Sequence, residues 1–138
     1  MELKQWLNRG YEISKRLAVK RAYLESLGNV ISNYEAREID RDNVENSAET
    51  LAIRWSETQK EVNELKRKLA KIDFEVDTEL RKLKSSNEYS VMFLRYVRRL
   101  SWEDIADSLN YSKQSVFRFN KDGLENLERV NCYRIYED

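Results

Sequence analysis

Between residues 48 and 84, apolar side chains recur every seven positions, and no other feature limits the fold of this chain so strongly. One series of positions is Trp55, Val62, Leu69, Val76 and Leu83, and the series between them is Leu51, Thr58, Leu65, Ile72 and Glu79, in which the polar Thr58 and Glu79 are the weak positions. This spacing predicts a helix with a single seam for packing. At about 1.5 Å per residue, the helix would be about 50 Å long. Because helices in proteins gain most of their stability by packing an apolar face, the seam predicts a partner helix.

The first 27 residues carry a second helical stripe, and they are the nearest candidate for that partner. Their apolar positions are Leu3, Trp6, Ile13, Leu17, Leu24 and Leu27. Gly28, together with the asparagine after it, predicts the end of this helix, because both accept the left-handed conformation that closes helices. The polar segment 29–47 is then a linker in which the chain can reverse. We therefore predict an antiparallel, coiled-coil-like hairpin over residues 1–84, with the tryptophans of both stripes in its core. The alternative is a homodimer through the same seam.

The composition agrees with an all-α fold and excludes several kinds of site. The chain has no Pro and three Gly, while Leu, Glu, Lys and Arg dominate, and these four residue types lose little freedom in a helix. No segment has the alternation of apolar and polar residues that is typical of a strand. With no His and a single Cys, Cys132, the chain has neither a Cys/His zinc site nor an intrachain disulfide nor catalysis by imidazole.

We do not expect an enzyme. The sequence has no glycine-rich phosphate loop and no nucleophile beside a base, so neither a cofactor nor a small-molecule substrate is expected. The longest apolar run is residues 91–94, far short of a membrane span, and the first residues lack the apolar core of a secretory signal. A cytoplasmic protein without a membrane partner is therefore expected. Basic and acidic residues both number 25, so the overall charge indicates no partner.

Three helix starts follow the heptad region, and each begins with a serine. Ser85 precedes a glutamate by three residues, as in a capping box, and Ser101 precedes two acidic residues of a first helical turn. Ser112 follows an Asn-Tyr pair and is the third start. These signals predict three short helices within residues 85–130, the first of which ends near Arg99.

The second and third of these helices meet at a tight corner. Their apolar edges are Ile105, Ala106 and Leu109 on one helix and Val116, Phe119 and Leu124 on the other. Asn110 stands where the chain must leave the first helix, and it accepts a positive φ. Ala106 is small enough for close approach, and Val116 folds back over it ten residues later. This spacing predicts a helix-turn-helix, whose second helix normally lies in the DNA major groove. The alternative is a purely structural corner. Trp102, at the start of the first helix, is expected to pack rather than to stack on a base.

Residues 91–127 resemble the fourth, promoter-reading region of bacterial sigma factors. The matching segments are LRYVRRLSWEDIADSL and NYSKQSVFRFNKDGLENL. A helical hairpin ahead of such a module, in a chain of this length, is similar to the small sigma-region-4-like proteins of phages and prophages. These include a family long catalogued as a domain of unknown function and similar to late-gene transcriptional activators. The resemblance implies a helix-turn-helix that binds double-stranded DNA and works with RNA polymerase.

One face of the predicted recognition helix carries the residues expected to read bases. They are Lys113, Gln114, Phe117, Arg118 and Lys121, and the sigma resemblance places base reading on the first four. Arg and Gln can each make two hydrogen bonds to one base edge, and a phenylalanine can press on a thymine methyl. The phosphate-contacting residues are expected to be Ser112, Arg95, Arg98 and Arg99. Residues 94–121 hold six basic and three acidic side chains, whereas the tail 131–138 is acidic.

These observations favour a sequence-specific regulator of transcription that binds double-stranded DNA, of the phage activator type that contacts RNA polymerase. Two other classes stay open. One is an assembly protein of the small-terminase type, in which the corner serves DNA packaging and the hairpin drives ring formation. The other is a protein-binding adaptor, an anti-sigma or anti-defence protein, that keeps the fold without binding DNA.

Overall fold

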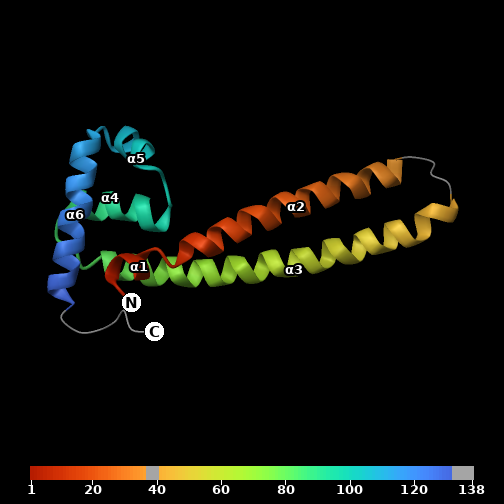
Figure 1. The fold of residues 1–138 in the computed structure, drawn as a ribbon, viewed down its shortest axis with the longest axis horizontal. Helices are drawn as coiled ribbons and strands as arrows, with labels where there is room; N and C mark the ends of the chain where they lie inside the picture. The colour runs from red at the N-terminus through yellow and green to blue at the C-terminus, as the bar shows by residue number, and fades with distance from the viewer. Residues whose placement is uncertain (37–40, 132–138) are drawn as a thin grey trace. The chain divides into compact units, whose positions relative to one another are not determined.

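The structure is a computed structural model that describes residues 1–36 and 41–131, without the side chains of residues 34–36 and 41–47. The described residues form helices and turns and contain no strand, so the predicted all-α fold is confirmed. The elements are α1 (Leu3–Leu7), α2 (Gly10–Ala36), α3 (Arg41–Leu80), α4 (Ser86–Met92), the π-helical turn η1 (Phe93–Val97), α5 (Trp102–Leu109) and α6 (Lys113–Val130) (Figure 1). None of these helices combines the length and the apolar character needed to cross a lipid bilayer. Nearly all of the predicted acidic tail lies outside the described residues.

The chain divides into two compact units, and each is described by itself. Unit 1 consists of residues 1–11 and 70–138, and unit 2 consists of residues 12–69. Both long helices therefore contribute to both units. This grouping differs from the linear division that we predicted at residue 84, because α1, at the start of the chain, packs against α6 near its end.

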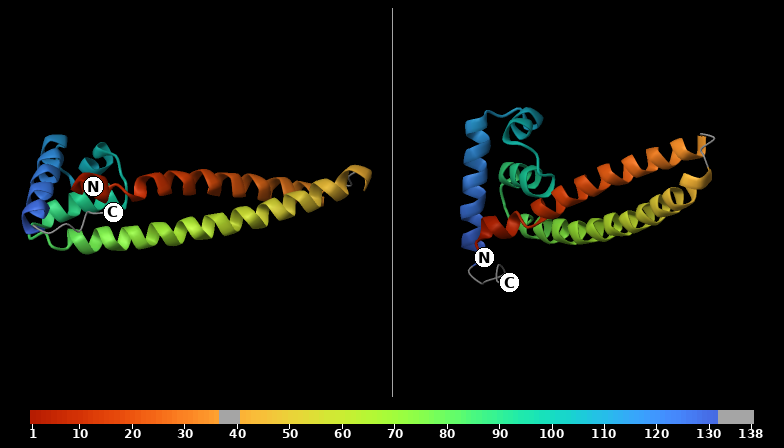
Figure 2. Two further views of the ribbon diagram at one scale, coloured as in Figure 1. Left: turned by 60° about the horizontal axis from the view of Figure 1, so that its bottom comes forward. Right: turned by 45° about the vertical axis from the view of Figure 1, so that its right-hand side comes forward.

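In unit 2, α2 and α3 lie side by side and run in opposite directions (Figures 1 and 2). The buried residues of this unit lie on the predicted stripes and are Leu17, Leu27, Thr58 and Val62. The hydroxyl of Thr58 donates to the carbonyl oxygen of Arg54 at 2.7 Å, so this buried polar group is satisfied. Nζ of Lys20 and Oε2 of Glu61, 2.7 Å apart, join the two helices beside the seam.

The helices of unit 2 are longer than the sequence predicts. The prediction that α2 ends at Gly28 is wrong, and both α2 and α3 extend into the segment 29–47 that we predicted to be a linker. A glycine costs only about 1 kcal/mol in a helix interior. Leu27 is buried and Ile31 is partly buried, so the apolar stripe of α2 continues past the glycine and outweighs this cost.

Of the two tryptophans that we predicted in the core of the hairpin, Trp55 faces α2, since a Cβ atom at Gly28 would lie 3.9 Å from its Nε1, but it is not buried. Trp55 is 39% exposed. Trp6 belongs to the separate helix α1, which closes at Asn8, and it is partly buried against the core of unit 1.

The core of unit 1 brings residues from the start of the chain into contact with residues of α3, α4, η1 and α6. Its buried residues are Leu3, Leu7, Val76, Leu80, Met92, Tyr96, Val97 and Leu127. Gly123 lies where α6 passes over α4, and a Cβ atom at this position would clash with Sδ of Met92. The glycine therefore permits a close approach of the two helices in which any larger residue would force the buried side chain of Met92 to move.

The helix predicted to end near Arg99 consists of two elements. α4 passes into η1, where the N–H of Arg98 donates to the carbonyl oxygen of Phe93, five residues earlier, at 3.1 Å. Such π turns are rare and are found frequently at functional sites. Arg99 then has φ +57°, so it stands in a left-handed turn after the helix and not on the helix itself.

Candidate nucleic-acid interface

Short-range hydrogen bonds shape the corner between α5 and α6. The hydroxyls of Ser101 and Ser112 accept hydrogen bonds from backbone N–H groups three residues later, each at 3.1 Å, so both serines cap helices as predicted. Asn110 has φ +57° and ψ +42°, the left-handed conformation that we predicted for it. The N–H of Tyr111 donates to the carbonyl oxygen of Ala106 at 3.0 Å. The chain therefore leaves α5 and enters α6 within a few residues.

A small apolar cluster holds the corner together. Its buried residues are Val91, Ile105, Ala106 and Val116. Ala106 and Val116 thus share one cluster, as their ten-residue spacing predicts. Tyr111 and Phe119 lie at its edge, with their ring centroids 5.4 Å apart. Leu124, which we predicted to pack here, instead packs against the core of unit 1, because α6 is long enough to contribute to both clusters.

The five side chains predicted to read bases are all exposed on α6, and they are Lys113, Gln114, Phe117, Arg118 and Lys121. Residues three and four apart lie on the same side of a helix. The buried residues of α6, which are Val116, Gly123 and Leu127, lie on the opposite side. Phe117 is 47% exposed, so the surface offers one aromatic ring among polar and basic groups.

Lys113 already has a partner within the corner. Its Nζ lies 2.8 Å from Oε1 of Glu103. The hydrogen bond from Lys113, aided by the charge of its ammonium group, lowers the pKa of Glu103 below its usual value. Both side chains are largely exposed, and an exposed ion pair contributes little to stability. Lys113 can therefore exchange Glu103 for a nucleic-acid group at little cost.

Trp102 links the preceding helix to this exposed face. The guanidinium group of Arg95 lies 4.2 Å from the centroid of the Trp102 ring. The same ring meets Phe117 edge-on, with centroids 5.2 Å apart. Trp102 is partly buried against the corner cluster, so the predicted packing role is confirmed. On the other side, Arg118 lies 5.1 Å from the centroid of Phe119.

The three arginines predicted to contact phosphates have different surroundings. Arg98 is exposed and has no side-chain hydrogen bond or ion pair with any described residue. Arg95 donates to the carbonyl oxygen of Leu100 at 2.9 Å and pairs with no described carboxylate. Arg99 donates to both carboxylate oxygens of Asp73, at 2.8 and 3.3 Å, and only 16% of its side chain is exposed. Sequence reasoning missed this partner on α3, because no local signal connects positions 26 residues apart.

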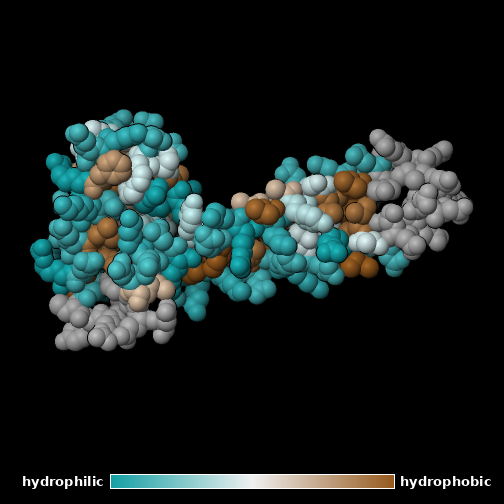
Figure 3. Space-filling model, in the orientation of Figure 1, coloured by the Kyte–Doolittle hydropathy of each residue, from teal (hydrophilic) through white to brown (hydrophobic). Residues whose placement is uncertain are grey.

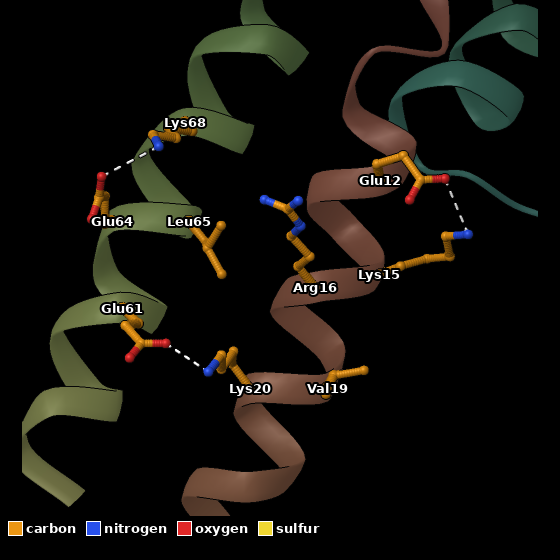
Figure 4. A pocket seen from close by; sticks show the side chains of 9 residues that line it. All are labelled: Glu12, Lys15, Arg16, Val19, Lys20, Glu61, Glu64, Leu65 and Lys68. Carbon is orange, nitrogen blue, oxygen red and sulfur yellow. Dashed lines mark ion pairs between the residues drawn. The ribbon is translucent and has the colours of Figure 1, made fainter. Parts of the chain in front are cut away.

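A groove of about 520 Å³ lies between α2 and α3 in unit 2, and Figure 4 shows the side chains along it. Four basic and three acidic residues line it together with Val19 and Leu65. The ion pairs are Glu12–Lys15 at 3.1 Å, Glu61–Lys20 at 2.7 Å and Glu64–Lys68 at 3.3 Å (Figure 4). Since most charges of the groove are paired, it offers an anion only Arg16.

The described residues also lack a metal centre, since no three acidic or cysteine side chains among them gather as metal ligands do. No family model matches the chain, and neither a curated protein nor a solved structure matches it. The residues of the corner and their geometry are therefore the main indications of a function among the described residues.

Proposed function

We propose that the chain is a sequence-specific transcription regulator that binds double-stranded DNA, with α5 and α6 as its helix-turn-helix. The observation that carries this proposal is the exposed face of α6, which presents basic, amide and aromatic side chains from a helix that a buried cluster anchors to α4 and α5. An α-helix fits the major groove of DNA. A surface that is already held in place loses less conformational entropy when it binds.

The residues of this face have different roles in the proposal. Arg118 has a planar fork of donors that matches the two acceptors of guanine, and Gln114 matches the donor and acceptor of adenine. Phe117 contacts the methyl group of thymine. Lys113 and Lys121 add positive charge and single hydrogen bonds at the two ends of the face.

Phosphate contacts hold the helix in position without reading sequence. Arg98, exposed and without a charged partner among the described residues, is the first candidate. Ser112 lies at the start of α6, where backbone N–H groups can meet a phosphate. Arg95, whose guanidinium group lies over the ring of Trp102, is a further candidate for a phosphate contact. Arg99 pairs with Asp73, which offsets its charge, so Arg99 attracts a phosphate less strongly than Arg98 does.

The sigma resemblance suggests how such a regulator acts. It supports a phage-type activator that places itself on DNA through the corner and contacts RNA polymerase. In this proposal the finer architecture is an antiparallel hairpin joined to a sigma-region-4-like module, and the hairpin serves for assembly or for contact with the polymerase.

We further propose that unit 2 pairs with a second copy of the chain. Its exposed large apolar residues are Val19, Tyr23, Val30, Ile53 and Trp55. Figure 3 shows apolar areas among hydrophilic ones on this unit. Arg16 and Arg21 of α2 form no ion pair with a described carboxylate, and Glu57 of α3 forms none with a described basic group, whereas Lys20 and Glu61 already pair within the chain. Two copies related by a two-fold axis along the helices would place α2 of one copy on α3 of the other and bring these charges together.

Selection of bound sequences from random duplex DNA, run beside a light-scattering mass, tests the proposal. A regulator should yield a motif and a monomer or dimer, and the symmetry of the motif should report the dimer geometry. A ring of eight or more copies would favour a packaging protein. Absence of duplex binding at low salt, where phosphate contacts are only weakly screened, would favour the protein-binding adaptor.

A further inference from the structure

A second cleft, of about 540 Å³, lies in unit 1 beside the turn that follows η1. It is lined by Asn8, Tyr11, Arg95, Arg99 and Ser101. None of these residues belongs to the exposed face of α6. The volume lies within the range of about 300–1,000 Å³ that is usual for small-ligand sites.

The lining of this cleft is basic and carries no carboxylate. Two of its five residues are arginines. Asp73 offsets the charge of Arg99, but Arg95 pairs with no described acidic group, so the cleft keeps a positive charge. A guanidinium group is also weakly hydrated and presents its donors in a fork that matches phosphate oxygens.

Both arginines are already held in place. The carboxylate of Asp73 fixes Arg99 with two hydrogen bonds, and the carbonyl oxygen of Leu100 together with the ring of Trp102 fixes Arg95. A ligand therefore need not pay the entropy of ordering these long side chains. In addition, Arg99 has φ +57°, a conformation that is unfavourable for a residue with a side chain and that clusters at ligand sites.

Neutral donors complete the lining. The hydroxyl of Ser101 accepts the N–H of Asp104 through its oxygen, which leaves its own hydrogen available to an acceptor. Asn8 contributes an exposed amide, and the half-exposed ring of Tyr11 lies beside it in the lining. Two guanidinium groups, a hydroxyl and an amide form a donor-rich set that suits an anion with several oxygens.

We propose that this cleft binds a phosphate group. The phosphate belongs either to the backbone of bound DNA, in which case the inference deepens the proposed function, or to a free phosphorylated compound. Arg95 lies on Trp102, and Trp102 meets Phe117 on the exposed face of α6. Occupancy of the cleft therefore changes the environment of the Trp102 indole.

The fluorescence of Trp102 provides the readout. The full chain carrying Trp6→Phe and Trp55→Phe, checked for folding by thermal melting, leaves Trp102 as the only indole. Inorganic pyrophosphate is titrated at constant ionic strength, and a saturable change in fluorescence is expected. Asn8→Asp places a carboxylate at the exposed mouth of the cleft and should weaken this binding by about tenfold or more, because like charges a few ångströms apart repel. Asn29→Asp makes the same change of charge on an exposed position of unit 2 and should leave the binding unchanged.

The second arm distinguishes the source of the phosphate. Binding of the same two variants to duplex DNA is compared at several salt concentrations. Weaker duplex binding by Asn8→Asp than by Asn29→Asp, without any pyrophosphate signal, assigns the phosphate to DNA. A pyrophosphate signal that Asn8→Asp removes supports the cleft even if the chain binds no duplex, so failure of the proposed function stays distinguishable. The inference is overturned if pyrophosphate gives no saturable signal up to about 10 mM, where even weak sites fill, and both variants bind duplex alike. A pyrophosphate signal that Asn8→Asp leaves intact overturns it as well.

Discussion

At the residue scale, Arg118 and Arg98 have different surroundings, and these surroundings suggest different roles in the DNA binding that we propose. Arg118 extends from the exposed face of the anchored helix α6. Arg98 follows the π-helical turn and is exposed to solvent. A guanidinium group that enters the groove meets base edges, whereas one beside the groove meets phosphates of any sequence.

Arg118→Ala should cost about 1–3 kcal/mol on the selected site and relax the preference at one base position. Its forked donors are expected to satisfy both acceptors of one guanine, and alanine replaces neither hydrogen bond. Arg98→Ala should instead weaken all duplexes alike and lower the slope of log affinity against log salt by about one. Titrations of matched and scrambled duplexes at several salt concentrations measure both effects.

Arg67→Ala is the control for these variants, because it removes one exposed basic residue from unit 2. Thermal melting checks that each variant is folded. An equal loss on matched and scrambled duplexes for Arg118→Ala would show that this side chain does not read a base.

Tyr96 should make the stability of the fold sensitive to alkaline pH. Burial in the core of unit 1 raises the pKa of Tyr96, because the phenolate is poorly solvated there, although the nearby charge of Arg95 opposes this. The folded state therefore holds the phenol proton more tightly than the unfolded chain does. The resulting stability is complete below the unfolded pKa of about 10 and is lost as the pH rises through the folded pKa. Urea unfolding at pH 8 and at pH values above 10 should show this loss.

Tyr96→Phe separates this effect from general alkaline unfolding. The variant loses the hydrogen bond that the phenol donates to Oδ1 of Asn120 at 2.8 Å, so it should be less stable at pH 8 by about 0.5–1.5 kcal/mol. Its stability should then fall less between pH 8 and alkaline pH than that of the wild type. Tyr23→Phe, at an exposed position, should follow the wild type. Parallel pH profiles for all three proteins would contradict the assignment to Tyr96.

At the scale of elements, the contact between α4 and α6 depends on Gly123. Gly123→Ala should destabilise the protein by about 1–3 kcal/mol, because the new methyl group meets the side chain of the fully buried Met92. The steric cost of the methyl group should exceed the gain of about 1 kcal/mol that alanine brings to a helix, so a net loss of stability is expected. Chemical unfolding of the single variants and of the double variant with Met92→Ala measures the coupling.

The double variant tests whether Met92 is the reason that position 123 requires a glycine. Once Met92→Ala has removed the obstructing side chain, Gly123→Ala should stabilise the protein through helix propensity alone. A reversal of sign between the two backgrounds is therefore expected. The same destabilisation in both backgrounds would show that Met92 is not the reason for the glycine.

Helix starts were predictable from the sequence, whereas helix lengths were less so. Ser85, Ser101 and Ser112 all cap helices as predicted, because each cap depends on an N–H group three residues away. Gly28 was predicted to end a helix, but packing on the stripe beyond it outweighs the local preference. The π-helical turn at residues 93–97 was not predicted, because the sequence there carries no signal that we recognise.

At the scale of the whole molecule, the proposed pairing of two copies predicts that the protein in solution has the molecular mass of a dimer. The protein should be a dimer whose population rises with concentration. Tyr23→Glu should shift it toward the monomer, because it places a charge on the exposed apolar surface of α2. Sedimentation or light scattering over a range of concentrations measures the shift.

Phe74→Glu is the matched control, since Phe74 is 74% exposed and lies in unit 1. It should leave the dimer unchanged. An unchanged mass for Tyr23→Glu, or a wild type that stays monomeric at every concentration, would refute pairing through this surface.

The sequence by itself determined the features that depend on neighbouring residues. Heptad spacing and helix-forming composition determined the all-α fold, and Asn110 and the serine caps determined the corner. These signals act within one or two helical turns, so they can be read along the chain. The exposed face of α6 follows from the same periodicity, because Val116 must point toward the corner cluster.

Only the tertiary structure decided which distant residues meet. It placed Asp73 beside Arg99, Met92 beneath Gly123 and the first eleven residues in the same unit as α6. Such contacts depend on how helices pack that are far apart along the chain. Each contact contributes a small free energy, and many other contacts that the same residues could make would contribute about as much. For this reason the sequence could indicate that three arginines surround the corner, but not that an ion pair with α3 holds one of them while another stays exposed.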